Sequence, residues 1–206
     1  MDINERLTAF SNELFDIQDE RLRQFAMHLL SGAPDYFFTA PASSSGKYHP
    51  YFSREVGGLV KHTRCVIFYT RCLSESFNFD RHTTDLAIIA ALAHDIKKQG
   101  NDNGGGKTVW EHPELAYNFV LDTQKSHPQL ISEEDASIIA KAILSHMGKW
   151  QHEEKYVKGR QQYPLPLTNF DSIIQSADYI ASRTEIKEFA FRTNEGVSIP
   201  SFYPHN

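Results

Sequence analysis

The spacing of apolar residues constrains this chain more than any other feature of its sequence. Apolar side chains recur at intervals of three and four in several segments, and runs that alternate as a strand would are few. Residues 4–30 form the first such segment, with a break expected near Asp16 to Asp19, and its apolar stripe is typical of a packing helix. The pattern predicts an all-α fold.

Length and composition are those of one ordinary soluble domain. A chain of 206 residues with 40% hydrophobic and 23% charged residues can bury a single core without disulfides. It contains no apolar run of about 18 residues, and its first residues, MDINERLTAF, lack the basic start of a signal peptide. We therefore expect a cytoplasmic protein that neither spans a membrane nor is secreted, with Cys65 and Cys72 as reduced core thiols.

The net charge limits the partners. At −5, the chain lacks the excess of Lys and Arg with which proteins hold long duplex nucleic acid. A small phosphorylated substrate is easier to accommodate. The sequence does not determine the oligomeric state, and both a monomer and a homo-oligomer are compatible with it.

Further helices are predicted at residues 59–73, 83–98, 112–124 and 132–146, with a last one beginning at Asp171. Thr83 or Thr84 is the expected N-cap of the second of these, and Ser132 that of the fourth. Residues 31–56 are rich in Gly, Pro and Ser, which predicts a long loop of the kind that is often functional. Residues 189–206 are expected to form a surface tail.

An adjacent imidazole and carboxylate, His94 and Asp95, follow the apolar run of residues 88–93. Burying an aspartate there without a cation or several donors would cost several kcal/mol. A bound metal would offset that cost. Zinc, manganese, iron and cobalt all accept neutral imidazole and carboxylate ligands.

Three motifs resemble the HD superfamily, whose pattern is a histidine, then His-Asp, then a distant aspartate. They are GGLVKHT at 57–63, LAHDIKK at 92–98 and QSADYIASR at 175–183. The resemblance implies an HD-domain helical bundle in which His62, His94, Asp95 and Asp178 coordinate a divalent metal, which activates water for attack on phosphorus. The alternative is that these residues only cap and pair within a helical bundle.

The same resemblance implies a layout of one globular domain. Residues 1–56 would supply an N-terminal helix and a substrate-side loop packed on the core, residues 57–188 the HD-domain core, and residues 189–206 the tail.

Two more histidines, His112 in WEHPELA and His146 in LSHMGKW, resemble the additional ligands of two-metal branches of the superfamily. With Asp95 as a bridge they would hold a second ion. Alternatively, one of them contacts the phosphate or acts as a general acid on the leaving group. The cofactor expected is one or two ions of Mn, Co, Zn, Fe or Ni, with Mg also possible.

Asp95 and Lys98 are the candidate catalytic residues; Lys98 either neutralises phosphate charge or is a solvated cation at a helix end. The loop SSSGKYHPYFSREVGG at 43–58 resembles the segment before the first histidine in HD proteins related to a 3′-to-5′ exoribonuclease. That type bears an accessory oligonucleotide-binding β-domain, which this sequence lacks, so polymeric RNA is a weaker expectation. The candidate substrate contacts are Lys47, His49, Arg54, Lys149 and Arg183.

The leading hypothesis is a metal-dependent phosphohydrolase that cleaves a phosphoester or phosphoanhydride bond of a nucleotide or short oligonucleotide. Two alternatives stay open: a di-iron oxygenase of HD type, and a non-catalytic module that senses a nucleotide. A phosphate-binding loop of the Walker kind is not indicated, because GGGK at 104–107 lacks the rest of that motif.

Overall fold

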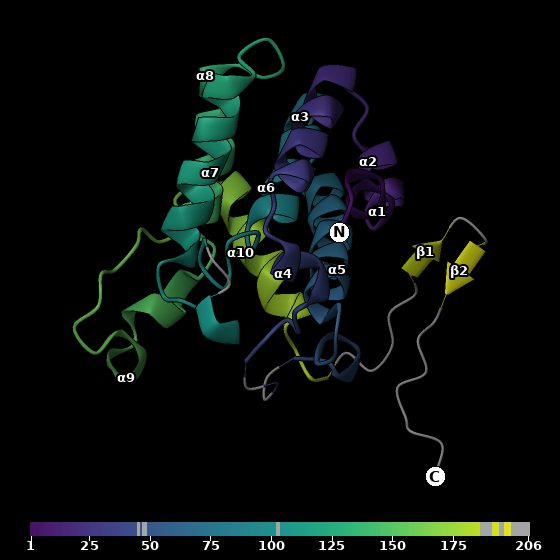
Figure 1. Cartoon of the computed structure of the whole chain (residues 1–206). Coiled ribbons are helices and arrows are strands. Elements are labelled where there is room, and N and C mark those ends of the chain that lie inside the picture. The colour runs from purple at the N-terminus through teal and green to yellow at the C-terminus, as the bar shows by residue number, and fades with distance from the viewer. Residues whose placement is uncertain (45, 47–48, 102–103, 186–190, 194–195, 199–206) are drawn as a thin grey trace.

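The computed structural model describes residues 1–44, 46, 49–101, 104–185, 191–193 and 196–198. It is a bundle of helices (Figure 1), which confirms the predicted all-α class. The α-helices are α1 Ile3–Thr8, α2 Ser11–Asp16, α3 Glu20–Ser31, α4 Asp35–Thr39, α5 Gly58–Ser76, α6 Arg81–Ala93, α7 His112–Ser126, α8 Glu133–Ser145, α9 Glu154–Val157 and α10 Asn169–Ala181. The 3-10 segments are η1 Tyr51–Ser53, η2 Gly104–Gly106 and η3 Gly148–His152.

The strands of the described residues are β1 Phe191–Thr193 and β2 Gly196–Ser198, which pair antiparallel with each other. This hairpin lies in the stretch for which the sequence predicts a surface tail. The rest of the predicted tail, residues 189–190, 194–195 and 199–206, lies outside the described residues.

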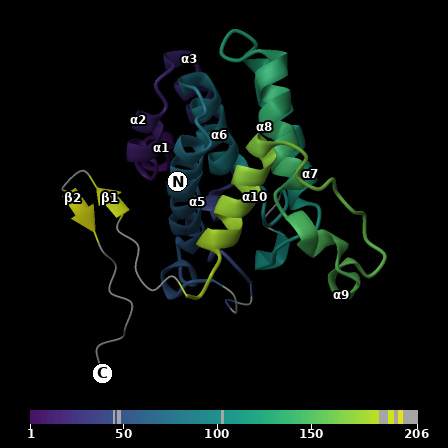
Figure 2. The ribbon, with the colours of Figure 1, turned by 180° about the vertical axis from the view of Figure 1, so that it is seen from behind.

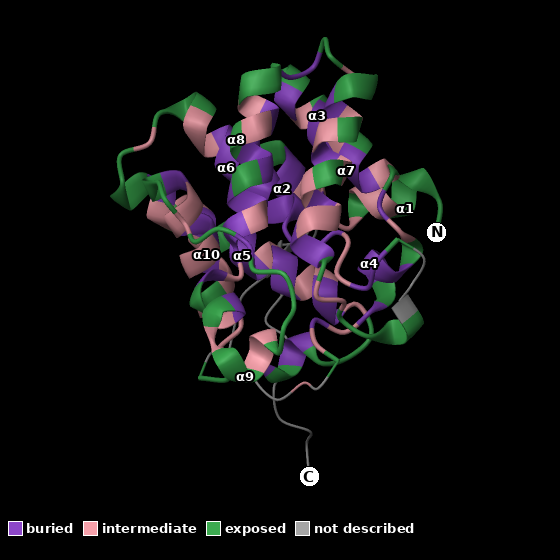
Figure 3. Cartoon of the chain, turned by 90° about the vertical axis from the view of Figure 1, so that its left-hand side faces the viewer, coloured by how far each residue is buried: buried purple, intermediate pink, exposed green. Residues whose placement is uncertain are grey.

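Helix α6 lies at the centre of the bundle. Each residue from 85 to 93 is buried, so this helix contacts protein on all its sides, as expected for a helix that is hydrophobic all round. Helices α5, α8 and α10 pack against it, and Figure 2 shows α10 lying between α5 and α8. Figure 3 shows the buried residues on the inner sides of the helices and the exposed ones on their outer faces, at their ends and in loops. The two residues that directly follow α6, His94 and Asp95, are therefore also buried in the core.

The N-terminal helices are tied to α5 by buried ion pairs. Glu13 on α2 accepts a hydrogen bond from Nε of Arg64 at 2.8 Å, and Asp16 accepts one from Arg71 at 2.7 Å. Both acids are less than 10% exposed. Removing one partner of such a pair leaves a buried charge, so these contacts fix the position of α2 on the bundle.

The first predicted helix is interrupted twice. The expected break is present between α2 and α3, where Asp19 caps α3 by accepting hydrogen bonds from two backbone amides. A second break, at Ala9 and Phe10, is not in the predicted pattern. Phe10 has non-helical backbone angles and is fully buried, with its ring stacked 5.8 Å from that of Phe37. Tertiary packing, rather than local propensity, sets this break.

The loop predicted at 31–56 is more structured than expected, since it contains α4 and η1. Tyr36, Phe37 and Phe38 on α4 are buried and pack against the bundle. The loop is also pressed against the start of α5, because a Cβ at Gly58 would lie 2.2 Å from the carbonyl oxygen of Ser53. Only glycine permits this approach, which fixes the loop just before His62.

Three smaller predictions were wrong. The N-cap of α6 is Asp80, whose carboxylate accepts a hydrogen bond from the amide of Thr83, and not Thr83 or Thr84. This helix ends at Ala93 and gives way to turns instead of continuing to residue 98. Cys65 is buried as expected, but Cys72 is exposed because it lies on the outer face of α5.

Within the described residues, no helix is both long and apolar enough to span a bilayer.

Candidate metal centre

Six side chains that are distant in the sequence meet at the inner ends of the helices. Each comes from the end or the inner face of a different element, apart from the neighbouring pair that follows α6. They are His62 on α5, His94 and Asp95 after α6, His112 at the start of α7, His146 after α8 and Asp178 on α10. The structure thus brings together all six ligands suggested by the sequence.

The first group contains His62, His94 and Asp178, whose ligand atoms lie within 4.8 Å of one another. Oδ1 of Asp178 lies 3.0 Å from Nε2 of His62 and 3.7 Å from Nε2 of His94. Both imidazoles are fully buried, whereas the carboxylate is 23% exposed. These atoms could hold one ion with an open side at Asp178.

The second group contains Asp95, His112 and His146, again within 4.8 Å. Oδ1 of Asp95 lies 3.4 Å from Nε2 of His112 and 3.8 Å from Nε2 of His146. Its other oxygen, Oδ2, lies 3.4 Å from Nε2 of His94 and 3.8 Å from Nε2 of His62. The two oxygens of one carboxylate therefore face one group each, as in a bridging ligand.

Main-chain carbonyls determine which imidazole nitrogen is free. Nδ1 of His94 lies 2.7 Å from a carbonyl oxygen three residues earlier, and the same contact measures 2.7 Å at His112 and 2.6 Å at His146. A carbonyl can only accept, so Nδ1 carries the proton and Nε2 presents its lone pair to the site. The Nε2 atoms of His112 and His146 are 3.3 Å apart, so two lone pairs face each other. A cation between them would remove this repulsion.

Buried polar atoms without hydrogen-bond partners also indicate a metal site. Nε2 of His62, Nε2 of His94 and Oδ1 of Asp95 are buried and have no hydrogen-bond partner among the described residues. Buried polar atoms are seldom left unpaired in folded proteins. Imidazole nitrogen with carboxylate oxygen is a donor set for zinc, manganese, iron, cobalt or nickel.

Burial keeps most of these histidines neutral. It lowers the pKa of His112 to about 3 and also lowers the pKa of His62 and of His146. Neutral imidazole is the form that binds a metal. His94 is the exception: burial lowers its pKa, but the Asp95 carboxylate outweighs that effect and raises it. The negative charge of Asp95, which favours a charged His94, would equally favour a cation at this position.

Neighbouring side chains stabilise the ionised form of the Asp95 carboxyl group. Burial opposes ionisation of this carboxyl, but Lys98 and His94 outweigh burial and hold its pKa well below the ordinary value. Lys98 also donates a hydrogen bond from Nζ to Oδ2 of Asp95. The carboxylate is therefore ionised across the physiological pH range and ready to act as a ligand.

A cavity of about 220 Å³ opens on this cluster. Its lining combines ligands of both groups with a cation and several neutral side chains: His49, Asp95, Lys98, His112, His146, Met147, Trp150, Gln175, Asp178, Tyr179 and Ser182. We call it the metal cavity. It offers space for water and a small anion beside both groups.

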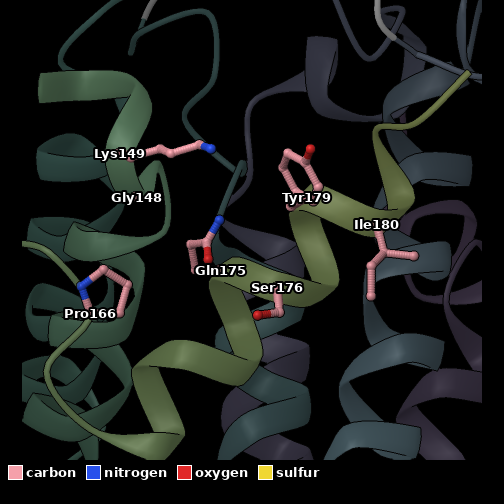
Figure 4. A pocket seen from close by; sticks show the side chains of 7 residues that line it. All are labelled: Gly148, Lys149, Pro166, Gln175, Ser176, Tyr179 and Ile180. Atoms are coloured by element: carbon pink, nitrogen blue, oxygen red, sulfur yellow. The ribbon is translucent and has the colours of Figure 1, made fainter. Parts of the chain in front are cut away.

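Lys149 and Arg183 lie in two neighbouring pockets. Lys149 lines one of about 520 Å³, which shares Gln175 and Tyr179 with the metal cavity. Figure 4 shows Gln175 and Tyr179 on α10, with Lys149 on the segment that faces this helix. Arg183 lines a third pocket, of about 380 Å³.

The three residues suggested in the loop before α5 have different positions. His49 lines the metal cavity, and burial lowers its pKa to about 3. Arg54 is exposed and is not among the residues lining these three cavities; its Nε donates a hydrogen bond to the carbonyl of His49 at 2.7 Å. It holds the loop that carries His49. Lys47 lies outside the described residues.

Sequence reasoning missed the aromatic residues beside the metal cavity. Trp110, Trp150 and Tyr156 line the third pocket, and Trp150 also lines the metal cavity. A signal was available, because one tryptophan lies two residues before His112 and the other four residues after His146. Each tryptophan is thus adjacent to a ligand of the second group.

Comparison with known proteins agrees with this geometry. The HD domain family matches over residues 59–183. The 3′-5′ exoribonuclease YhaM of Bacillus licheniformis is 24% identical over 197 residues, which cover 92% of this chain and 60% of that protein. The chain thus spans less than two thirds of this relative's length. A search of solved structures found no match. Because the family match covers more than half of the residues and includes all six candidate ligands, the chain belongs to the HD-domain family.

Proposed function

We propose that the protein is a metal-dependent phosphohydrolase that cleaves a phosphoester or phosphoanhydride bond of a nucleotide or short oligonucleotide. One observation carries the proposal: the two oxygens of Asp95 face two separate ligand groups at the wall of one open cavity. Family membership and the similarity to an exoribonuclease add support.

Each group of ligands would hold one ion. His62, His94 and Asp178 would bind the first and His112 with His146 the second, with Asp95 shared. When bound, such ions lower the pKa of a coordinated water and neutralise charge on phosphate oxygens. Burial favours the neutral form of His62, His112 and His146. Contacts of Nδ1 with main-chain carbonyls orient His94, His112 and His146.

Lys98 would contact a phosphate oxygen of the substrate. Its side chain lines the metal cavity and is only 12% exposed, so its charge is little screened by water. Its hydrogen bond to Asp95 keeps it at the wall of the cavity before a substrate enters. A charge-assisted hydrogen bond from Lys98 would then orient the phosphate against the ions.

The pocket next to the metal cavity would accommodate the part of a short oligonucleotide that lies beyond the scissile phosphate. The pocket that contains Lys149 adjoins the metal cavity along α10 and offers a cation, an amide and two hydroxyl groups, on Lys149, Gln175, Ser176 and Tyr179 (Figure 4). These groups suit a neighbouring phosphate and its sugar. The net charge of −5 still argues against a long duplex as the substrate.

The test is a turnover screen of metal-stripped protein reloaded separately with manganese, iron, cobalt, zinc or magnesium. Mononucleotides, cyclic nucleotides and short RNA and DNA are supplied, and products are identified by mass spectrometry. We expect metal-dependent release of phosphate or nucleotide, lost in His62→Ala and kept in His82→Ala, whose histidine is exposed at the far end of α6. Oxygen consumption by an iron-loaded protein without hydrolysis would instead identify an oxygenase, and nucleotide binding without turnover a sensor.

A further inference from the structure

The third pocket, of about 380 Å³, lies beside the metal cavity, and the two share His49, Met147, Trp150 and Ser182 as lining residues. Trp110 and Tyr156 line the third pocket but not the metal cavity. We call it the aromatic pocket. Its volume falls within the range of about 300–1,000 Å³ that is typical of small-ligand sites.

Aromatic rings form the walls of this pocket. The chain has two tryptophans, and both line it together with Tyr156. All three rings are only partly buried. Trp150 and Tyr156 meet edge to face, with ring centroids 5.7 Å apart and planes at 69°. Partly open aromatic rings beside a polar centre are suited to stacking on a flat, unsaturated ligand.

Contacts behind the rings hold them in place. Nε1 of Trp110 donates a hydrogen bond to the carbonyl of Gln161 at 2.7 Å, and Arg160 lies over the Trp110 ring at 5.3 Å. A ring held in this way loses little freedom when a ligand stacks on it. The indole N–H of Trp110 is already paired, so its ring contributes a face rather than a donor.

One cation lines the pocket and two more lie beside its rings, although the chain as a whole is acidic. Arg183 lines it, and Lys149 lies 5.8 Å from the Trp150 ring centroid, in addition to Arg160 over Trp110. These charges favour an anionic ligand. His49, which lines both cavities, has a buried Nδ1 without a hydrogen-bond partner among the described residues. His49 thus places a polar side chain at the junction of the two cavities, where a ligand with a hydroxyl-bearing linker would pass.

A ligand that matches both cavities has a flat ring at one end and a phosphate at the other, with a hydroxyl-bearing linker between. We propose that the aromatic pocket binds the base of a nucleotide whose phosphate occupies the metal cavity. This assignment rests on the function proposed above. It identifies Trp110 and Tyr156, neither of which lines the metal cavity, as binding residues for the base.

Intrinsic fluorescence offers a direct test, because both tryptophans of the chain lie in this pocket. Adenosine 5′-monophosphate and ribose 5-phosphate, which differ only in the base, are titrated into manganese-loaded protein. We expect the first to quench the fluorescence and the second not to. By calorimetry we expect adenosine 5′-monophosphate to bind at least about 10-fold more tightly, as stacking of one base is worth about 1–3 kcal/mol.

Matched variants locate the effect. Trp110→Ala and Tyr156→Leu should weaken binding of adenosine 5′-monophosphate about 10-fold and leave ribose 5-phosphate unaffected, whereas Trp110→Phe and Tyr156→Phe, which keep a ring, should retain most of the affinity. Equal affinity of the wild type for the two ligands would overturn the proposal. So would unchanged binding in both ring-deleting variants. Circular dichroism checks that each variant is folded.

The binding data separate this proposal from the hydrolase. Base-dependent binding without turnover of any substrate would support the aromatic pocket and reject the hydrolase. Hydrolysis with equal kcat/KM for substrates with and without a base would support the hydrolase and reject the pocket.

Discussion

Asp95 is the residue on which both ligand groups depend, because each of its oxygens faces a different pair of imidazoles. The other ligands belong to one group only. His146, for example, lies in the second group and has its Nδ1 bound to a main-chain carbonyl. Replacing these two residues should therefore have different effects on the number of ions bound.

We expect Asp95→Ala to lose both ions and turnover, and His146→Ala to keep the ion of the first group. The activity of each variant should fall at least about 100-fold, because ligand loss disturbs both charge neutralisation and water activation. Metal analysis of the purified variants gives the stoichiometry. His82→Ala serves as the control. Two ions retained by Asp95→Ala would contradict the bridging role.

Among the elements, η3 illustrates how one glycine sets the position of a binding segment. Gly148 begins it with φ of +55°, and a Cβ there would lie 2.9 Å from Cγ of Gln175 on α10. The following residues, Lys149 and Trp150, line the two pockets beside the metal cavity. The close approach of this segment to α10 thus places both side chains.

Gly148→Ala should be more destabilising than Gly159→Ala. Gly159 also has a positive φ, of +79°, but nothing lies within 4 Å of a Cβ added there. Strain alone should cost about 1–2 kcal/mol of unfolding free energy at either site, and the contact with Gln175 should add about 1–3 kcal/mol at residue 148. Denaturant unfolding measures both values, and KM for nucleotides should rise only in Gly148→Ala. Equal losses of stability would show that the close contact is unimportant.

The elements that the sequence predicts well are those with local signals. The helix after Ser132 follows from its N-cap and acidic first turn, and the ligand positions follow from short motifs. Helix α4 was missed because its burial depends on contact with the rest of the bundle. The aromatic pocket was missed for the same reason: Trp110 and Trp150 are 40 residues apart, and only the packing of α7 on α8 places both at one cavity.

At the scale of the whole molecule, Tyr36 links the N-terminal part to the turn after the metal ligands. Its hydroxyl accepts a hydrogen bond from the amide of Gln99 at 3.1 Å and donates one to the carbonyl of Gly100 at 2.6 Å. Burial raises the pKa of Tyr36 to about 12, with a contribution from the charge of Asp95. The folded protein therefore retains the proton that the unfolded chain loses near pH 10.

This shift predicts an alkaline loss of stability. The contribution of Tyr36 should be fully present below about pH 10, the unfolded value, and should be lost as the pH rises towards about 12. Wild type should lose about 1.4 kcal/mol more than Tyr36→Phe between pH 8 and pH 11, since one pKa unit corresponds to about 1.4 kcal/mol. Denaturant unfolding at pH 8 and pH 11 tests this. Tyr163, whose pKa is also raised to about 12, is present in both proteins, so its effect cancels. A constant difference between the two proteins at all pH values would contradict the prediction.

The burial of α6 has a consequence for how such a protein can diverge. His94 and Asp95 leave a helix enclosed by the core, so changes around them disturb folding. Most side chains that line the Lys149 pocket and the aromatic pocket instead come from residues 147–166 and from the outer face of α10. Much of the backbone of residues 147–166 is irregular. Mutations of the exposed side chains there, such as Lys149, can accumulate at less cost to folding than changes in α6. Descendants of such a gene would keep their chemistry while exchanging one ligand preference for another.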